Sequence, residues 1–258
     1  MCINKITTVF YSPTKTSGKV AKAISFGTGV EQYEEIDLTF DNSTEPIIIK
    51  DSIVVISAPV YSGRIAPVAL ERIKRLQGIN SPAIIVAVYG NRDYDDALVE
   101  LYDAVVENGF TVLSAGAFIG EHSFSREGMP IAQNRPDADD LSIAERFGSD
   151  SLAKLRSTVI PEKLHIKGNR PYCIPDPLPT IAPVCGDWCQ ADGMCIDVCS
   201  TEAIYFDDDG KISTDAAKCT LCCACVKACP NSARIFDTPF TKMLHDLCKE
   251  RREPEIFL

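Results

Sequence analysis

The chain contains, between residues 219 and 230, the stretch Cys219-Thr-Leu-Cys222-Cys223-Ala-Cys225-Val-Lys-Ala-Cys229-Pro230. Its spacing, C-x2-C-x2-C-x3-C-P, is typical of cysteines that bind a [4Fe-4S] cluster. Three thiolates on one tight loop bind three corners of a cubane, whereas the fourth cysteine begins a short helix and ligates a second cluster. A proline suits this turn, since its missing N–H and fixed φ cost nothing where a helix begins. The spacing therefore predicts a related half-motif upstream.

That half-motif reads Cys185-Gly-Asp-Trp-Cys189-Gln-Ala-Asp-Gly-Met-Cys195-Ile-Asp-Val-Cys199-Ser200. Its end, from Cys195 to Ala203, aligns with Cys225 to Ala233 as an internal repeat with an offset of thirty residues. The repeat predicts two clusters related by a pseudo-twofold axis. We assign the upstream cluster to Cys185, Cys189, Cys195 and Cys229, and the downstream cluster to Cys199, Cys219, Cys222 and Cys225.

The upstream half departs from the regular pattern, because it reads C-x3-C-x5-C-x3-C-S with Gly193 as the expected bend. This half is therefore compatible with a complete cubane of shifted potential. It is also compatible with a labile or three-iron site, if Cys185 does not reach the metal.

Disulfides and structural zinc are the alternatives to iron–sulfur clusters for these cysteines. Disulfides need an oxidising compartment, but the N-terminus has no signal-peptide core. Structural zinc favours two separated cysteine pairs over interleaved triplets followed by a lone cysteine. The remaining cysteines are expected to be small buried hydrophobes, with Cys223 close enough to replace Cys222; they are Cys2, Cys173, Cys223 and Cys248.

The 258 residues suffice for a medium domain plus a small one. No apolar run approaches the roughly 18 residues of a membrane span, so we expect a soluble, cytoplasmic protein without membrane contact. The net charge of −10 argues against nucleic acid. Many acidic side chains lie near the cluster cysteines, where they provide either solubility or a surface for a basic redox partner; they are Asp187, Asp192, Asp197, Glu202, Asp207, Asp208, Asp209, Asp215 and Asp237.

The N-terminal part alternates apolar strands with amphipathic helices. Strand-like runs are expected at 5–11, 33–38, 52–57, 83–88 and 111–118. Helices are expected at 19–24, 67–76, 95–106 and from 136 to about 158. Five strands separated by helices predict an α/β fold with a doubly wound, five-stranded parallel sheet. Ligands bind such sheets at the carboxyl ends of the strands.

A hydroxyl-rich loop follows the first strand and precedes its helix. Hydroxyls and free N–H groups at a helix N-terminus bind phosphate, although Ser and Thr are also ordinary N-caps. Four hydroxyls within six residues favour phosphate; the loop residues concerned are Ser12, Thr14, Lys15, Thr16 and Ser17. Two further loops, 58–64 and 89–94, carry aromatic residues and glycines after the third and fourth strands.

Residues 5–120 resemble a flavodoxin, and the whole chain resembles the flavodoxin–ferredoxin fusion proteins of anaerobic bacteria and archaea. Flavodoxins read S/T-x-T-G-x-T/S at the phosphate loop, and Ser12, Thr14 and Ser17 match, whereas Lys15 replaces the usual glycine. The resemblance implies FMN, with its phosphate on residues 12–17 and its ring between the later loops. The ring would contact Pro59, Val60, Tyr61, Ser62, Gly63, Tyr89, Gly90, Asn91 and Tyr94.

Within this ring site, Tyr61 and Tyr94 are predicted to stack on the flavin, or else to be ordinary packing residues. Gly90 and Asn91 are predicted to offer backbone groups to the pyrimidine edge. In the long polar loop 121–136, His122 is either a surface residue or a proton donor to a reduced flavin.

We expect four segments: an FMN-binding domain at 1–158, a proline-rich linker at 159–180, a small α+β ferredoxin-like domain at 181–238, and a C-terminal helix at 239–258. The apolar stripe of that helix is expected to be core, and residues 249–254 its solvated end.

A chain with two clusters and FMN is expected to transfer electrons between a low-potential carrier and a partner, which is a ferredoxin or a flavoenzyme. A homodimer is compatible with the sequence. One alternative is a flavoenzyme that reduces a small substrate at FMN, with the clusters as electron feed. Another is a zinc-stabilised binding module. No G-x-G-x-x-G follows a strand, so direct use of NAD(P)H is not indicated.

Overall fold

The computed structural model describes residues 4–157, 164–175 and 179–258. Cys2, the predicted helix end at Thr158 and parts of the predicted linker lie outside these ranges. The strands are β1 (Lys5–Phe10), β2 (Gln32–Asp37), β3 (Ile47–Lys50), β4 (Ile53–Tyr61), β5 (Arg64–Ile65), β6 (Leu76–Ile79), β7 (Pro82–Tyr89), β8 (Thr111–Ile119), β9 (Val184–Cys185), β10 (Ile204–Phe206), β11 (Ile212–Thr214), β12 (Arg234–Ile235) and β13 (Glu255–Phe257). The helices are α1 (Thr16–Gly27), α2 (Pro67–Ile73), α3 (Ala97–Glu107), α4 (Ala138–Arg156), α5 (Met194–Asp197), α6 (Ala224–Ala228) and α7 (Pro239–Leu247).

The largest sheet has the strand order β13-β8-β7-β4-β1-β2, with β5 paired to β4. The strands β2, β1, β4, β7 and β8 are mutually parallel. Counted along the chain among these five, the order is 2-1-3-4-5, which is that of flavodoxin-like sheets. The predicted doubly wound, five-stranded parallel sheet is therefore confirmed.

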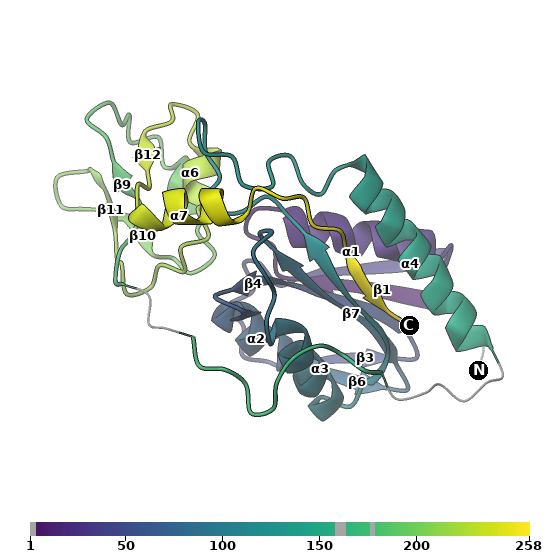
Figure 1. Ribbon diagram of the computed structural model, residues 1–258. Helices are drawn as coiled ribbons and strands as arrows, with labels where there is room; N and C mark the ends of the chain where they lie inside the picture. The colour runs from purple at the N-terminus through teal and green to yellow at the C-terminus, as the bar shows by residue number, and fades with distance from the viewer. Residues whose placement is uncertain (1–3, 158–163, 176–178) are drawn as a thin grey trace.

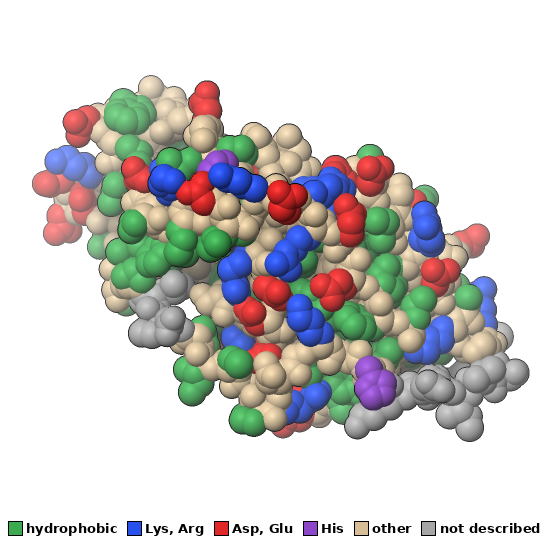
Figure 2. Space-filling model, viewed as in Figure 1, with side chains coloured by type: hydrophobic (Ala, Val, Ile, Leu, Met, Phe, Trp, Pro, Cys, Tyr) green, Lys and Arg blue, Asp and Glu red, His purple; other side chains and the backbone are tan. Residues whose placement is uncertain are grey.

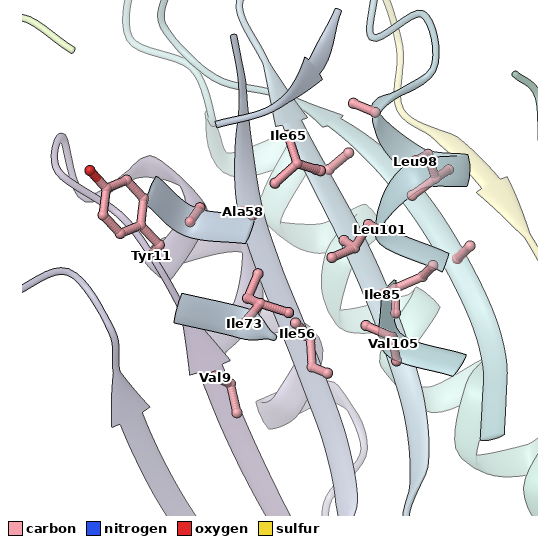
Figure 3. Packing of buried hydrophobic residues seen from close by; sticks show 14 of the residues in the cluster. Val9, Tyr11, Ile56, Ala58, Ile65, Ile73, Ile85, Leu98, Leu101 and Val105 are labelled. Atoms are coloured by element: carbon pink, nitrogen blue, oxygen red, sulfur yellow. The ribbon is translucent and has the colours of Figure 1, made fainter. Parts of the chain in front are cut away.

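Helices cover both faces of this sheet (Figure 1). One apolar cluster packs α2 and α3 against residues such as Ile56 and Ile85, and Figure 3 shows how their side chains interdigitate. A second cluster packs α1 and α4 against the opposite face, around Ile24, Phe118 and Phe147. Because both faces are covered, the central strands read as continuous apolar runs rather than as alternating patterns.

Two local expectations are wrong. The helix expected at 67–76 ends at Ile73, and Leu76 instead begins β6, which pairs in parallel with β3. Leu76 fits the helical spacing but is buried by this small sheet. The C-terminal helix expected at 239–258 ends at Leu247, and the segment 249–254, expected to be its solvated end, leads into β13, which pairs antiparallel with β8. Both differences arise from contacts distant in sequence, which local spacing does not report.

Residues 179–238 form a second, smaller unit, here called the cysteine lobe. It contains the two-stranded antiparallel sheets β10–β11 and β9–β12 and the short helices α5 and α6. Figure 1 shows that it sits beyond the carboxyl ends of the parallel strands. This is the end of the sheet where ligands bind in doubly wound folds.

Polar contacts fix the cysteine lobe to the sheet. The Tyr11 hydroxyl at the end of β1 shares a hydrogen bond of 2.7 Å with the Ser200 hydroxyl. Arg72 is 7% exposed and donates to the carbonyl oxygens of Ser200 and Leu38, each at 2.9 Å. On the other side, the Lys227 ammonium pairs with Glu121 at 3.1 Å. The lobe is therefore anchored at two separate points.

The described part of the predicted linker, residues 164–175, lies against α3 and the turn before it. Asp96 accepts hydrogen bonds from the backbone N–H groups of Asn169 and Cys173, at 2.8 and 2.6 Å. Asp103 pairs with Arg170 at 2.6 Å. Side-chain anchors therefore hold this segment on the sheet domain, in addition to the stiffness that its prolines provide.

Candidate cofactor sites

A cavity of about 850 Å³ lies where the sheet meets the cysteine lobe. This is within the range of about 300–1,000 Å³ that cofactor and ligand clefts occupy. The structure brings together most of the residues predicted for the flavin. Those that line the cavity are Ser12, Thr14, Thr16, Ser17, Pro59, Val60, Tyr61, Ser62, Gly63, Tyr89 and Gly90.

The loop after β1 presents polar groups to this cavity at the N-terminus of α1. The Ser12 hydroxyl already accepts a hydrogen bond from the Gly18 N–H at 3.0 Å, so it acts as a cap for the helix. The Ser17 hydroxyl is different, because it is buried without a hydrogen-bond partner among the described residues. Ser17 is 1% exposed and belongs to the cavity wall. A buried orphan hydroxyl at a helix N-terminus fits a phosphate.

Lys15 lies in the left-handed region, with φ of 66°, and directly precedes α1. This is the conformation that explains the glycine of the flavodoxin pattern, and a lysine there costs of the order of 1 kcal/mol. The chain nevertheless forms the same turn, in which the Lys15 N–H donates to the Ser12 carbonyl at 3.0 Å. Lys15 does not line the cavity.

Asn91 and Tyr94 also lie outside the cavity wall. Tyr94 is fully buried, donates to Glu255 at 2.7 Å and meets Tyr89 edge-on with ring centroids 5.5 Å apart. A stacking role for Tyr94 does not fit this position; it is a packing residue beneath Tyr89. The Asn91 side chain binds the Cys248 and Glu250 carbonyl oxygens, both at 2.9 Å. Asn91 therefore fixes the C-terminal segment.

Tyr61 is the predicted stacking residue that does line the cavity. Burial raises the pKa of its phenol well above the usual range, and the neighbouring Cys222 thiol adds to this shift. Cys219 and Cys223 act in the same direction. Tyr61 therefore lies in the wall of the flavin-type cavity and is influenced by the downstream cysteines.

Part of the cavity wall comes from the polar loop 121–136, in which His122 is a candidate proton donor to the flavin, and part comes from a helix not predicted to contribute to it. Phe124 comes from the loop after β8, and Phe240, Met243 and Leu244 come from α7. The apolar stripe of α7 is visible in the sequence, and Leu244 does pack in a small core with Ile131. The same stripe also faces the cavity. The sequence does not indicate this, because it does not show where α7 lies relative to the sheet.

His122 lines the cavity, and its Nδ1 accepts a hydrogen bond from the Phe124 N–H at 3.0 Å. The neutral ring therefore carries its proton on Nε2. Burial, followed by the charges of Lys227 and Arg92, lowers the pKa of His122 to about 4. An exposed surface histidine, which is one of its two predicted roles, does not fit a position in the cavity wall.

The lowered pKa predicts a pH-dependent stability. Between about pH 4 and 6.5 the unfolded state binds a proton at His122 that the folded state does not, so stability falls as the pH drops through this window. From pH 7.5 to 6 the loss from this residue is about 0.8 kcal/mol. Urea unfolding of wild type, His122→Gln and His245→Gln at both pH values tests this. His122→Gln should remove the loss of stability, whereas His245→Gln should show the same loss as wild type. Equal losses in all three proteins would contradict the assignment to His122.

The downstream cysteines surround a second, small cavity in the cysteine lobe. Its wall contains all four residues assigned to the downstream cluster, Cys199, Cys219, Cys222 and Cys225, together with Cys223. Thr220 lies in this wall and also in the wall of the large cavity. The two sites are therefore separated by a single segment of chain.

The upstream cysteines Cys185, Cys189 and Cys195 belong to the apolar cluster of the lobe, which also includes Cys225. The internal repeat of the sequence is matched by equivalent hydrogen bonds to two of the cysteines. The Ala203 N–H donates to Cys199 Sγ and the Ala233 N–H donates to Cys229 Sγ, both at 3.2 Å. Equivalent N–H···S bonds at equivalent positions support the pseudo-twofold arrangement and are a means of tuning cluster potentials.

Two thiols of this lobe are held protonated by their surroundings. Burial is the first cause that raises the pKa of Cys195 and of Cys222 to about 11. Iron ligation supplies the positive charge that ionises such thiols. Within the described ranges, no three His, Cys, Asp or Glu side chains converge on a single-ion site. A cubane differs from such a site, since its four thiolates bind four different irons.

Comparison with known proteins gives partial matches. No protein-family profile matches the chain. Over 60 residues it is 40% identical to a polysulfide reductase chain of Wolinella succinogenes, a match that covers 22% of this chain and 31% of that protein. Over 63 residues it is 38% identical to the uncharacterized ferredoxin-like protein YdhX of Escherichia coli, which covers 24% of this chain and 28% of that protein. The chain thus spans less than a third of the length of these relatives.

Similar solved structures cover the other part of the chain. A flavodoxin from the domain Archaea is 16% identical with a TM-score of 0.40, over 59% of this chain and 99% of that one. The Fusobacterium nucleatum flavodoxin bound to flavin mononucleotide is 15% identical with a TM-score of 0.36, over 59% and 96%. None of the described helices has the length and apolar character that a bilayer crossing needs. By its strand order and its cysteine-rich matches, the chain combines a flavodoxin-like domain with a ferredoxin-like region, which implies iron–sulfur clusters.

Proposed function

We propose that this chain is an electron-transfer protein that holds two [4Fe-4S] clusters and one FMN. One observation carries the proposal: Thr220 lines both the flavin-type cavity and the cavity of the downstream cysteines. Clusters move single electrons, and FMN, when bound, accepts one or two. Two such sites that share a wall make a short electron path with a two-electron store at one end.

The same geometry supports an order for the two clusters along the electron path to FMN. The downstream cysteines adjoin the flavin-type cavity through Thr220, whereas the upstream cysteines Cys185, Cys189 and Cys195 line neither cavity. Trp188, between two upstream ligands, is 56% exposed. Acidic side chains gather on this outer part of the lobe in Figure 2. A protein partner with a basic surface would therefore exchange electrons at the upstream cluster.

The residues around the large cavity have distinct roles in this proposal. Ser17 and the N-terminus of α1 hold the FMN phosphate. Tyr61 and Tyr89 provide aromatic surface for the ring. Phe240, Met243 and Leu244 cover the cavity with apolar side chains and exclude water.

One observation favours a second function, the direct reduction of a small substrate at FMN. His122 lines the cavity, and because its Nδ1 accepts from the Phe124 N–H, the neutral ring keeps its Nε2–H as a hydrogen-bond donor for a bound substrate. The two functions are distinguished by reoxidation of the reduced protein. Small organic acceptors that reoxidise it with saturation kinetics would favour the enzyme, whereas second-order kinetics with a protein acceptor would favour the carrier.

The proposal is tested by the visible spectrum of anaerobically purified protein, with flavin, iron and acid-labile sulfide assayed on the same sample. The expected result is about one FMN with about eight irons and eight sulfides. About four or seven irons would mean that the upstream site is incomplete. No flavin, even after FMN is added, would make the sheet domain a docking scaffold and refute the proposed path.

The FMN site makes a sharper prediction at Ser17. Replacing Ser17 with alanine should weaken FMN binding about 10- to 100-fold, because a hydrogen bond to a charged group contributes about 1.5–3 kcal/mol. Ser57→Ala is the matched control, since the Ser57 hydroxyl is also buried without a partner among the described residues but does not line the cavity. Fluorescence titration of the apoprotein measures both affinities. Equal affinities in the two variants would remove Ser17 from the phosphate site.

A further inference from the structure

Arg234 in β12 is a buried cation among the cluster cysteines. It is 3% exposed, and its Nη1 donates to Cys185 Sγ at 3.2 Å. Its Nη2 donates to the Pro183 carbonyl at 2.9 Å and to the Thr214 hydroxyl at 2.7 Å, while its Nε has no partner among the described residues. None of the ion pairs found in the described ranges includes Arg234. Burying a guanidinium without a counter-charge is costly, so a negative group is expected beside it.

The internal repeat shows that this arginine is not required by the fold of the lobe. With the offset of thirty residues, Arg234 corresponds to Ile204, which is 5% exposed and belongs to the apolar cluster. The residues before them, Ala203 and Ala233, make equivalent N–H···S bonds. The repeat therefore substitutes a cation for an apolar side chain at this position. The arginine adjoins Cys185, the first ligand of the half with irregular spacing.

We propose that Arg234 is the buried counter-charge of the upstream cluster and a positioning residue that raises its reduction potential. This inference rests on the proposed function. Each cluster takes up one electron from an external donor and gains one negative charge. A fixed guanidinium at a ligand sulfur stabilises that reduced form, as hydrogen bonds to cluster sulfurs do in general. Burial raises the pKa of the downstream ligand Cys225 and the charge of Arg234 opposes this rise, so a shift of the downstream cluster in the same direction is expected.

Potentiometric titration of the full chain, followed by electron paramagnetic resonance, tests the inference. The variants are Arg234→Met, which removes the charge, and Arg234→Lys, which keeps it. Arg146→Met is the control, because Arg146 is an exposed arginine on α4, remote from the lobe. Cys189→Ser identifies which reduction step of the titration belongs to the upstream cluster, since it alters a ligand of that cluster only. Dithionite is the one-electron donor.

Arg234→Met should make reduction of the upstream cluster at least tenfold less favourable, which is a shift of about 59 mV to lower potential. Arg234→Lys should shift it less than half as far, and Arg146→Met should leave it unchanged. The inference would be overturned if the potential of the upstream cluster were unchanged in Arg234→Met, or if it shifted equally in both Arg234 variants.

Cluster loss in a variant would also be decisive. If Arg234→Met retains only about four irons, Arg234→Lys should still hold about eight. Iron loss in both variants would show a packing role and contradict the charge assignment. Wild-type protein with about four or seven irons would mean an incomplete upstream site and would overturn the inference. Wild-type protein without FMN or without clusters would refute the proposed function itself, and either result is seen before any variant is compared.

Discussion

A chain in which Cys222 and Cys223 are both alanine is expected to bind about four irons instead of about eight. It is also expected to lose electron transfer to FMN. The reason is the position of the downstream site: its wall contains Cys222, and its neighbour Thr220 lines the flavin-type cavity. Without that cluster, the remaining cysteine ligands do not border the flavin-type cavity. Iron and sulfide assays, and anaerobic stopped-flow reduction of the flavin, measure the two effects.

Both cysteines must be changed because they are adjacent and line the same small cavity. Cys223 is 2% exposed, and it lies at φ of 56° just before α6. Because it lines the same cavity as the ligands, we expect its thiol to replace a missing ligand. Cys223→Ala alone is therefore the matched control and should keep about eight irons and rapid flavin reduction. If the double variant still reduces FMN at the wild-type rate, the proposed order of the electron path is wrong.

The parallel sheet could be predicted because its determinants are local. Runs such as residues 53–56 and 83–88 are apolar throughout, as strands buried on both faces must be. The grouping of the downstream cysteines could be predicted in the same way, because cluster ligation fixes the spacing of cysteines along the chain. The wall of the downstream cavity contains all four cysteines assigned from that spacing alone.

The features that could not be predicted from the sequence depend on contacts between segments that are distant along the chain. Nothing in residues 255–257 indicates that they pair with β8, since a three-residue edge strand has no periodicity to detect. Tyr94 shows the same limit: an aromatic residue in a loop at the correct edge of the sheet can face the ligand or the core. Here Glu255 of that returning strand accepts a hydrogen bond from the Tyr94 hydroxyl and keeps the tyrosine in the core. The unusual position of Arg234, by contrast, could have been detected from the sequence, because the internal repeat aligns this arginine with an isoleucine.

The largest effect on stability is expected from Asp140→Ala, with a loss of about 3–5 kcal/mol. Asp140 is fully buried and holds Arg135, which is 6% exposed, through two parallel hydrogen bonds. Removing the carboxylate leaves the guanidinium buried, with the Asp137 carboxylate at 3.8 Å as its remaining counter-charge. The capping box at the start of α4 is lost as well, because Asp140 also accepts from the Asp137 N–H at 2.9 Å. Urea unfolding followed by circular dichroism measures the loss.

Asp139→Ala is the matched control, since Asp139 is the preceding residue in the same first turn and is exposed. Its effect should stay within about 0.5 kcal/mol. The two variants should also differ locally, because Arg135 donates to the Arg252 carbonyl at 2.9 Å and so holds the segment that leads to β13. Hydrogen exchange at residues 255–257 should therefore accelerate in Asp140→Ala alone. Equal stabilities of the two variants would show that the Arg135–Asp140 pair does not stabilise the fold, and unchanged exchange would show that the C-terminal strand is held without it.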